Sequence, residues 1–486
     1  MNGSQESVLK QMGETGMVRR QMALRAAVFA FGLTLSALVY AGPLGVRPDG
    51  TVIVVPNAPH ERESAAARLL QEWLRKACRA ETGFEILAED KLGDAQGRAV
   101  LALGRTKWAP AEAAKLYRDG FIIRREGERV VIAGGEPAGT FFGAAHFLDK
   151  FCGVRFYMPG DLFTSLPEKP EVTLPDAVDI TEEPFVKNCT MTGVANMPAV
   201  EGPWLQRSTA HRKESFSHQH SMFQRFPPEQ FAQRFPEIYP ILKGQRYIPQ
   251  AANDQRWQPC LSEPKLLDAA EESAIAYFQK TPEVNFISFS VQDSHEFCQC
   301  PRCQAEVDKH RVADAKFGDV TAYSLMNATF INRLAERLEK KLPDKTIVYI
   351  AYAKVRRPPP FKLHRNVMPV LVFTIADTII DRVLEPGGNI PLDRWAEVSR
   401  RFGHHDWGEG MGYLIPRSYI GLTAQVARFV KQKGLSWGYA HFEAYPNWGL
   451  DGPKLYLTPK IWWNPDVDVD PLWRQFCADM FPQAQG

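Results

Sequence analysis

The fold is decided by two apolar runs, NFISFSV at residues 285–291 and LSWGYAHFE at residues 435–443. The first run is followed by Asp293, and the second ends in Glu443. Short runs of this kind are typical of strands that are buried on both faces of a parallel sheet. Apolar residues at helical spacing over residues 323–341 add a helix of the kind that connects parallel strands.

Six further runs extend this pattern from residue 186 to the end of the chain. Eight strands with helical or loop segments between them predict an α/β fold, a (β/α)₈ TIM-type barrel. An open α/β sheet is the alternative, because the second and third runs have the weakest patterns. The six runs are residues 186–192, 215–220, 257–262, 346–353, 367–375 and 412–416.

The chain before residue 185 has a different pattern, with short strands around two helices. Apolar residues recur at helical spacing from Ala66 to Ala77, and a second helix is expected at residues 140–151. We therefore predict a small α+β domain at residues 43–175 and the barrel at residues 185–486, with the Pro-rich stretch 159–184 as the linker. The expected strands are residues 51–55, 84–88, 99–104, 120–124 and 129–133, the last two forming a hairpin.

Residues 1–42 are typical of a signal peptide. Three arginines precede the apolar run 26–39, and the segment ends in the small residues Ala41 and Gly42. We expect an exported protein, periplasmic or secreted, with no stable membrane span after signal removal, because no other stretch has the roughly 18 apolar residues that a span needs. A single anchoring helix is the alternative.

Composition limits the partners that the chain can have. A hydrophobic content of 45% allows a large core and excludes a disordered protein. The 58 Lys and Arg residues are balanced by 56 Asp and Glu residues, without a basic stripe, which argues against nucleic acid as a partner.

Carboxylates at the strand ends are the candidate catalytic residues, because active sites of such barrels lie at the carboxyl ends of the strands. Glycosidases need two carboxyl groups, one as acid and one as nucleophile or base. We expect Asp293 or Glu296 as the acid and Glu443 as its partner. The alternative is that each carboxylate only accepts a hydrogen bond from a backbone amide or an arginine.

Other residues near the strand ends are candidates for substrate binding. Histidines follow the second run, and His404 and His405 precede the seventh. Aromatic rings in the same loops could cover the apolar face of a sugar. The candidates are His218, His220, Asp377, Asp406, Trp407, Arg417, Tyr445 and Trp448.

Four cysteines are candidates for a metal site. Cys298, Cys300 and Cys303 form a CxCxxC motif after the fourth run, and Cys260 or His295 could complete a closed structural Zn²⁺ site. A disulfide, for example between Cys300 and Cys303, is the alternative in an exported chain. No cofactor is expected to be required for catalysis.

Several motifs resemble known families. GTFFGAAHFLDKFCGVRFYMPGD at residues 139–161 resembles the end of the N-terminal domain of family 67 α-glucuronidases and family 20 β-hexosaminidases. From about residue 185, the chain resembles a family of bacterial exported proteins described as a domain of unknown function and grouped with glycosidase-type barrels. The matching pieces are QPCLSEP at 258–264, SFSVQDSHEFCQCPRC at 288–303 and EAYPNWGLDGPKLYLTPKIWWNPDVD at 443–468.

These resemblances imply a glycoside hydrolase that acts on a polysaccharide or oligosaccharide, α-glucuronidase-like or hexosaminidase-like. The adjacent Asp-Glu pair of family 20 is absent here, because Ser294 and His295 separate Asp293 from Glu296. A uronic acid would need cations such as Arg256, Lys354 or Arg417. The alternatives are a non-catalytic carbohydrate-binding protein on a glycosidase scaffold and, with less support, a zinc hydrolase.

Overall fold

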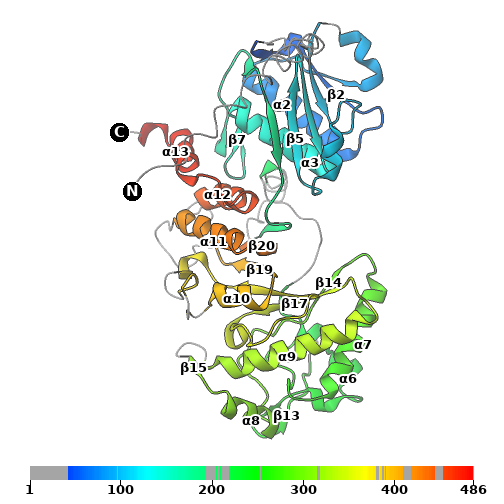
Figure 1. Ribbon diagram of the computed structural model, residues 1–486, viewed down its shortest axis with the longest axis vertical. Coiled ribbons are helices and arrows are strands. Elements are labelled where there is room, and N and C mark those ends of the chain that lie inside the picture. The colour runs from blue at the N-terminus through cyan, green and yellow to red at the C-terminus, as the bar shows by residue number, and fades with distance from the viewer. Residues whose placement is uncertain are drawn as a thin grey trace, which may run out of the picture.

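The computed structural model describes two six-stranded β-sheets, one in each half of the chain, and four two-stranded pairs (Figure 1). Its described residues are 42–95, 97–192, 204, 207–208, 218–251, 253–314, 318–378, 382–385, 388, 390–408, 418–443 and 452–484. Nearly all of the expected signal segment lies outside these ranges, so the signal peptide stays a prediction. Within them, no helix is long and apolar enough to span a membrane.

The first sheet is mixed and has six strands. The β5–β6 hairpin is antiparallel, β10 pairs antiparallel with β5, and β6, β4, β2 and β3 are parallel. The expected strands of this half are confirmed. In sheet order, the strands are β10 (Asp179–Glu182), β5 (Phe121–Glu126), β6 (Arg129–Gly134), β4 (Ala99–Leu103), β2 (Thr51–Val55) and β3 (Glu85–Ala88).

Two helices, α2 (Glu61–Cys78) and α3 (Pro137–Phe147), cover one face of this sheet. Alternate strand residues such as Ile53 and Val55 face them, whereas Val52 and Val54 belong to a separate cluster on the other face. This alternation is the period-2 pattern of a strand that is buried on both faces. The α3 helix continues as the short π-helical turn η4 (Leu148–Cys152).

The Pro-rich stretch expected as a linker contains strands instead. β9 (Val172–Leu174) pairs with β1 (Leu44–Val46), and β10 extends the first sheet. Another short pair is formed by β7 (Arg155–Phe156) and β8 (Thr164–Ser165). The alternating residues of Val172–Leu174 carry this pairing, and their burial pattern is buried, exposed, buried. The prolines lie between these strands, where no ladder hydrogen bond is needed.

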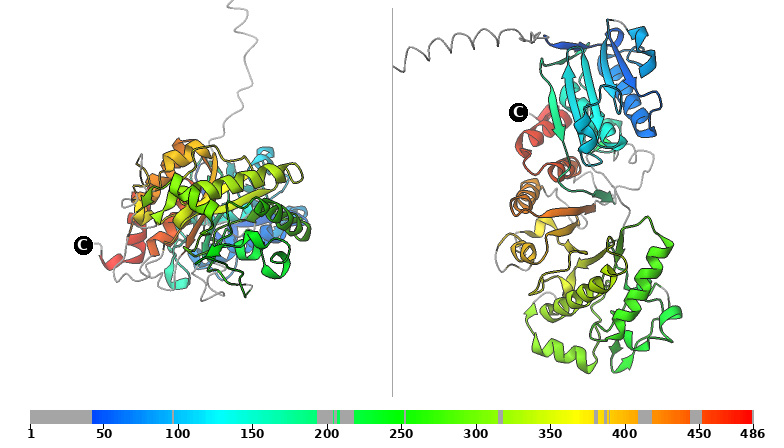
Figure 2. Two further views of the ribbon diagram at one scale, coloured as in Figure 1. Left: turned by 90° about the horizontal axis from the view of Figure 1, so that it is seen from below. Right: turned by 45° about the vertical axis from the view of Figure 1, so that its right-hand side comes forward.

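The second sheet is parallel throughout and also has six strands. Helices lie between most successive strands, as the sequence predicts for β/α units, but only the 3₁₀ turn η7 (Ala353–Val355) lies between β17 and β18 (Figure 2). In sheet order, the strands are β11 (Cys189–Thr192), β20 (Ser436–Glu443), β19 (Arg401–Asp406), β18 (Val367–Val372), β17 (Thr346–Ala351) and β14 (Phe286–Ser288). The helices are α7 (Lys265–Lys280), α8 (Pro301–Lys309), α9 (Val320–Glu339), α10 (Leu392–Val398), α11 (Ile420–Gln432), α12 (Gly452–Trp463) and α13 (Val469–Met480).

Short elements complete this half. They are α5 (Met222–Arg225), α6 (Pro228–Phe231) and the two-residue strand pairs β12 (Ile241–Leu242) with β13 (Gln245–Arg246) and β15 (Ala313–Asp314) with β16 (Gly318–Asp319).

A closed eight-stranded barrel is not confirmed. Among the described residues, β11 and β14 each pair with one neighbour, so the sheet is open. The expected strand at 257–262 is wrong. Pro259 lacks an amide donor, Gln258 donates its amide to Glu296 O, and Cys260 donates its amide to Ile238 O. Residues 218–220 of the expected second strand also have no strand structure, and the expected strand 412–416 lies outside the described residues.

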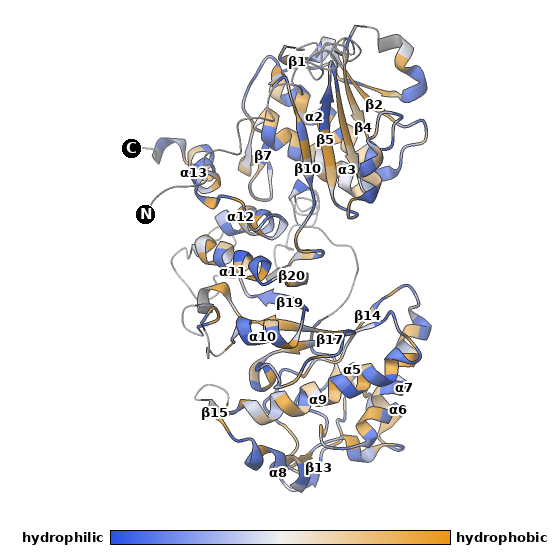
Figure 3. Ribbon diagram, viewed as in Figure 1, coloured by the Kyte–Doolittle hydropathy of each residue, from blue (hydrophilic) through white to orange (hydrophobic). Residues whose placement is uncertain are grey.

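β19 takes a central place in the sheet although its sequence, RFGHHD, is hydrophilic (Figure 3). Phe402, His404, His405 and Asp406 are all buried. A search for apolar runs misses such a strand, because its polar side chains are satisfied by partners in the fold rather than by water.

The two halves meet where Phe185 and Val186 donate their amides to Trp463 O and Trp462 O at the end of α12. Asp149 of η4 also accepts a hydrogen bond from Lys460 of α12, at 2.7 Å. A cavity of about 510 Å³ lies beside this junction. The helices α12 and α13 therefore connect the second sheet to the first.

Candidate functional site

The carboxyl ends of the parallel strands share one edge of the second sheet, which is where α/β proteins place their sites. Tyr352 directly follows β17, and Trp407 directly follows β19. Asp293 lies five residues beyond β14. Side chains from three different strand ends therefore come together at this edge.

Asp293 and Tyr352 form the central contact of the site. The Tyr352 hydroxyl donates to Asp293 Oδ1 at 3.0 Å. Burial raises the pKa of Tyr352 to about 12, and the charge of the Asp293 carboxylate and its hydrogen bond add to this effect. The phenol thus remains a hydrogen-bond donor at neutral pH, and Asp293 is exposed at the edge as its acceptor.

Aromatic and imidazole rings surround this contact. Ring centroids lie 5.7 Å apart for His220 and Tyr352, 5.9 Å for Tyr352 and Trp407, and 5.4 Å for Trp407 and His405. His405 Nδ1 lies 2.7 Å from His218 Nε2. These contacts link five side chains in series, from His220 to His218 of the same short segment, and we call these five residues the edge ring.

Two contacts of the histidine rings restrict which of their nitrogens can act as donors. His220 Nδ1 lies 2.6 Å from Val291 O, so this nitrogen must donate to the carbonyl. At 2.7 Å, the His218–His405 contact needs one donor and one acceptor nitrogen. At least one ring of that pair is therefore neutral at the contact.

Serine hydroxyls hold the segment that carries His218 and His220 beside the end of β14. Ser290 Oγ donates to His218 O at 2.8 Å, and Ser288 Oγ donates to Gln219 O at 3.2 Å. Ser221 N donates to Ser290 O at 3.1 Å. Hydrogen bonds that are shielded from water in this way hold the segment in place although it forms no strand.

Other predicted site residues have different positions. Asp406 is buried and accepts a hydrogen bond from Ile375 N at 3.1 Å, so its carboxylate supports the turn after β18. Glu296 is exposed, and its carbonyl accepts the Gln258 amide. Glu443 is the last residue of β20, one position beyond the Phe442–Asp406 pair.

The remaining predictions are untested. Asp377 lies in the short helix η8 (Ile375–Thr378), and only its backbone is described, as for Glu443. Arg417, Tyr445 and Trp448 lie outside the described residues. Of the cations considered for a uronic acid, Arg256 pairs with Asp254, and Lys354 donates to His295 O.

One member of the edge ring, Tyr352, was not expected from the sequence, and His405 was expected only near the seventh strand. Tyr352 directly follows an apolar strand, and an aromatic residue with a hydroxyl at a strand end is a usable signal. His405 lies in the polar strand β19, where His404 faces the other side and contacts Trp462. Alternation along that strand separates the two histidines, but only once the strand is recognised.

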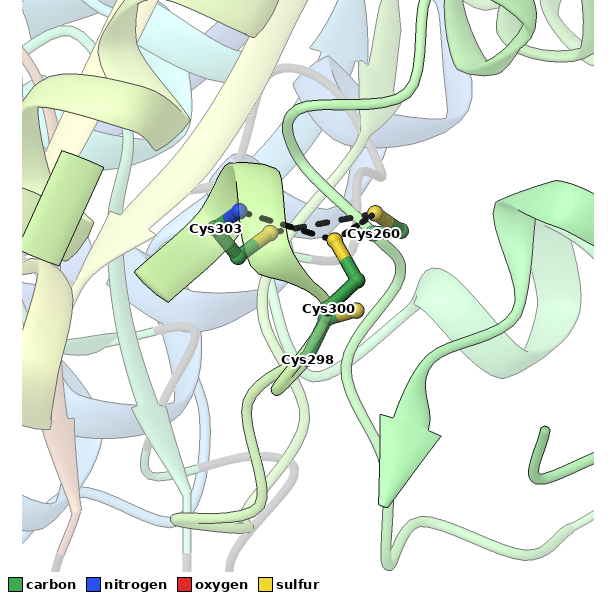
Figure 4. A group of neighbouring side chains, drawn as sticks. All are labelled: Cys260, Cys298, Cys300 and Cys303. Atoms are coloured by element: carbon green, nitrogen blue, oxygen red, sulfur yellow. Dashed lines mark hydrogen bonds between the residues drawn. The ribbon is translucent and has the colours of Figure 1, made fainter. Parts of the chain in front are cut away.

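The four predicted metal ligands come together (Figure 4). The sulfur atoms of Cys260, Cys298, Cys300 and Cys303 all lie within 4.8 Å of one another. Cys260 Sγ lies 3.6 Å from Cys300 Sγ and 3.7 Å from Cys303 Sγ. No disulfide joins them, because all four are free thiols.

Residues 158–485 match the profile of a family described as a domain of unknown function (DUF4838). No curated protein matches the sequence. The fold is similar to that of a β-N-acetylhexosaminidase from Bacteroides fragilis, at 12% identity and a TM-score of 0.45, over 92% of this chain and 93% of that one.

Two more solved structures are similar. An N-acetyl-β-hexosaminidase from Streptomyces plicatus has 11% identity and a TM-score of 0.48, with 91% of this chain and 93% of that one covered. A chitobiase from Flavobacterium johnsoniae has 10% identity and a TM-score of 0.47, with 90% of this chain and 70% of that one covered. At these TM-scores, the similarity supports no inference about a reaction.

Proposed function

Since the chain belongs to the family described as a domain of unknown function (DUF4838), we propose its function from the site: a glycoside hydrolase acting on a polysaccharide or its oligosaccharides. The observation that carries the proposal is the edge ring with Asp293 in contact with Tyr352. Rings such as Trp407 suit the apolar face of a sugar, and the carboxylate and hydroxyl suit its polar groups.

Asp293 fits the role of the ionised carboxylate. It is exposed, and its Oδ1 accepts the Tyr352 hydroxyl at 3.0 Å. A general acid instead needs an apolar environment that keeps it protonated. Asp293 and Glu296 are both exposed, so we assign the acid role to Glu443, the last residue of β20.

This assignment requires the second sheet to curve. In a flat sheet, β14 and β20 are four strand spacings apart, or about 19 Å, whereas the carboxyl pair of a glycosidase lies about 5 to 9.5 Å apart. The contacts of His218 support curvature. Its carbonyl accepts Ser290 Oγ beyond β14, and its ring reaches His405 of β19.

The contacts of His218 also support a barrel in which two of the eight strands are irregular. From β20 to β14 the sheet order follows the chain backwards, and the first strand, β11, pairs with the last, β20, as in a (β/α)₈ barrel. Residues 218–221 and 257–260 bind beside the end of β14 through Ser290, Gln292 and Glu296. We propose that these two segments take the places of the second and third strands.

The test is hydrolysis of a panel of chromogenic glycosides and plant and bacterial oligosaccharides. Asp293→Asn and Glu443→Gln should each lower kcat by about 10²–10⁴-fold, the usual contribution of acid–base groups. Glu283→Gln is the matched control, because Glu283 is exposed and precedes β14 at the opposite edge of the sheet. Full activity in Asp293→Asn, Glu296→Gln and Glu443→Gln would exclude this function.

A carbohydrate-binding protein without hydrolysis is the second candidate. It is favoured by the exposure of both Asp293 and Glu296, because neither lies in the apolar pocket that a general acid needs. Binding to a glycan array without product release from any substrate would support it. Trp407→Ala should abolish binding in that case, and one measured turnover would exclude it.

The proposed location of either activity is outside the cytoplasm. The proposal rests on the signal-like pattern of residues 1–42 alone. Fractionation of producing cells, followed by N-terminal sequencing of the recovered protein, tests it: removal of the segment near residue 42 is the expected result.

A further inference from the structure

We infer that Cys260, Cys298, Cys300 and Cys303 bind one Zn²⁺ ion in a closed tetrathiolate site. The inference is independent of the proposed hydrolysis, because it rests on sulfur geometry alone. Within the described part of the chain, this is the one group of three or more His, Cys, Asp or Glu residues arranged to hold a metal ion.

The distances fit tetrahedral zinc. Four thiolates at 2.3 Å from a zinc ion lie about 3.8 Å from one another. Cys260 Sγ lies 3.6 Å from Cys300 Sγ and 3.7 Å from Cys303 Sγ, and no pair exceeds 4.8 Å. Hydrogen bonds between thiols do not require four sulfurs to surround one point, whereas coordination of a metal ion does.

Hydrogen-bond donors surround the sulfurs. Ile241 N lies 3.3 Å from Cys298 Sγ, and Cys303 N lies 3.5 Å from Cys300 Sγ. The Ser262 hydroxyl lies 3.1 Å from Cys303 Sγ. Backbone amides and hydroxyls in this position orient metal ligands and compensate their charge.

The start of α8 adds to this environment. Cys300 is the N-cap residue of the helix, and Cys303 lies in its first turn. The amino end of a helix carries partial positive charge, which stabilises anionic sulfur. Three of the four cysteines are buried, and such buried soft ligands are typical of structural zinc rather than of catalytic zinc with an open position.

Metal binding would connect two loops. Zn²⁺ replaces four thiol protons, which leave to solvent, and no electron is transferred. Cys260 precedes α7, and Cys298 lies five residues beyond Asp293. Gln258 and Gln292 are already joined, since Gln292 N donates to Gln258 Oε1 at 3.0 Å. The ion therefore anchors the loop that carries Asp293 at the end where Cys298 lies.

The experiment measures metal in the full mature chain, purified without chelator or added metal. Elemental analysis should give about one zinc per chain, the stoichiometry of a single tetrathiolate site. Cys260→Ser and Cys303→Ser should lose most of it. Cys477→Ser, which changes a partly buried cysteine of α13 outside the cluster, should keep it.

A second measurement uses the parent protein, so that the inference can be tested even if the serine variants fail to fold. The parent protein, exchanged with Co²⁺ alone, should show intense sulfur-to-cobalt charge-transfer bands and the ligand-field bands of tetrahedral tetrathiolate cobalt. Zinc-free parent protein with a Cys260–Cys300 or Cys260–Cys303 disulfide in its peptide map would overturn the inference. Weak bands of an oxygen-ligated cobalt, or full zinc in both serine variants, would also overturn it.

Discussion

At the scale of single residues, Tyr352 contributes both a ring and a hydroxyl to the edge ring. Its ring packs between His220 and Trp407, while its hydroxyl donates to Asp293. The two contributions can be separated by mutation, because phenylalanine keeps the ring and removes only the donor.

The first prediction is that Tyr352→Phe lowers kcat/KM by about tenfold and leaves the fold unchanged. A hydrogen bond to a charged group contributes about 1.5–3 kcal/mol, and solvent at this exposed carboxylate reduces that value. Steady-state kinetics with thermal unfolding as the check of folding measure it. Tyr247→Phe removes a similar Tyr–Asp bond, to Asp254, outside the edge ring and should keep full activity. An unchanged Tyr352→Phe enzyme would contradict the prediction.

His146 of α3 provides the second prediction, which concerns pH. Burial, with the nearby charge of Lys460, lowers the pKa of His146 from 6.5 to about 4. Below pH 6.5 the unfolded chain therefore binds a proton that the folded chain excludes. The free energy of unfolding should fall as the pH drops from 6.5 to 4, by at most about 3 kcal/mol, and this contribution should level off below pH 4.

The measurement is urea unfolding at several pH values between 4 and 7. His146→Gln, which has no titrating group, should show a shallower decline than the parent. His295→Gln removes an exposed histidine and serves as the control. Equal slopes for the parent and His146→Gln would show that the buried imidazole does not cause the loss.

Sequence analysis could place Asp293, His218, His220 and Trp407 near the strand ends, because residue type and position relative to an apolar run are local properties. Their contacts are not local. The His218–His405 pair joins residues 187 positions apart. No spacing rule reaches that distance without the sheet order, and the same lack of contact information left Asp406 among the candidates.

At the scale of elements, the start of α2 shows how one helix of the first sheet is fixed. His60 is the N-cap, and its ring accepts the Arg62 amide, while Glu63 accepts the His60 amide in return. Glu63 also accepts Arg105 N at 3.1 Å from the loop after β4. The capping box therefore joins the helix to the sheet that it covers.

The third prediction compares the two residues of this capping box. His60→Ala should cost about 1 kcal/mol, the usual value for losing an N-cap side chain. Glu63→Ala should cost about 2 kcal/mol, because the amides of His60 and Arg105 both lose their acceptor, a carboxylate that is itself buried. Chemical denaturation of both variants measures the difference, and an equal loss would mean that the Arg105 contact contributes nothing.

Elements with strong periodicity were predictable, and polar ones were not. α9 and β17 lie close to their expected bounds, because their apolar residues repeat at a helical period or fill a whole strand. β19 is hydrophilic and central, and residues 257–262 are apolar but not a strand. Tertiary hydrogen bonds decide both cases, and these depend on residues far away in sequence.

At the scale of the whole molecule, the charges between α12 and the first half bind the two sheets into one body. Asp149 accepts Lys460 Nζ at 2.7 Å and pairs with Arg155 Nε at 2.9 Å. Arg155 also pairs with Asp479 of α13 at 3.2 Å. Burial alone would raise the pKa of Asp149, but the charges of Lys460 and Arg155 hold it below its ordinary value.

The fourth prediction is that Asp149→Asn loosens the junction. Lys460 and Arg155 keep their charges and lose the carboxylate between them. An unpaired buried charge costs about 3–5 kcal/mol, and the side chains here are 20–25% exposed, so we expect about 2–3 kcal/mol. Because the lost ion pair with Lys460 joins the two halves, the halves should unfold in two transitions and not in one. Protease should also cleave the variant near residue 184 sooner than it cleaves the parent protein.

Asp179→Asn is the matched control, since Asp179 pairs with Arg124 within the first sheet and is 64% exposed. Its effect should stay within about 0.5 kcal/mol, as for most surface changes. If Asp149→Asn lowered stability but kept one cooperative transition, the charges would contribute to the core of one half only. The backbone hydrogen bonds of Phe185 and Val186 to α12 would then be sufficient to hold the halves together.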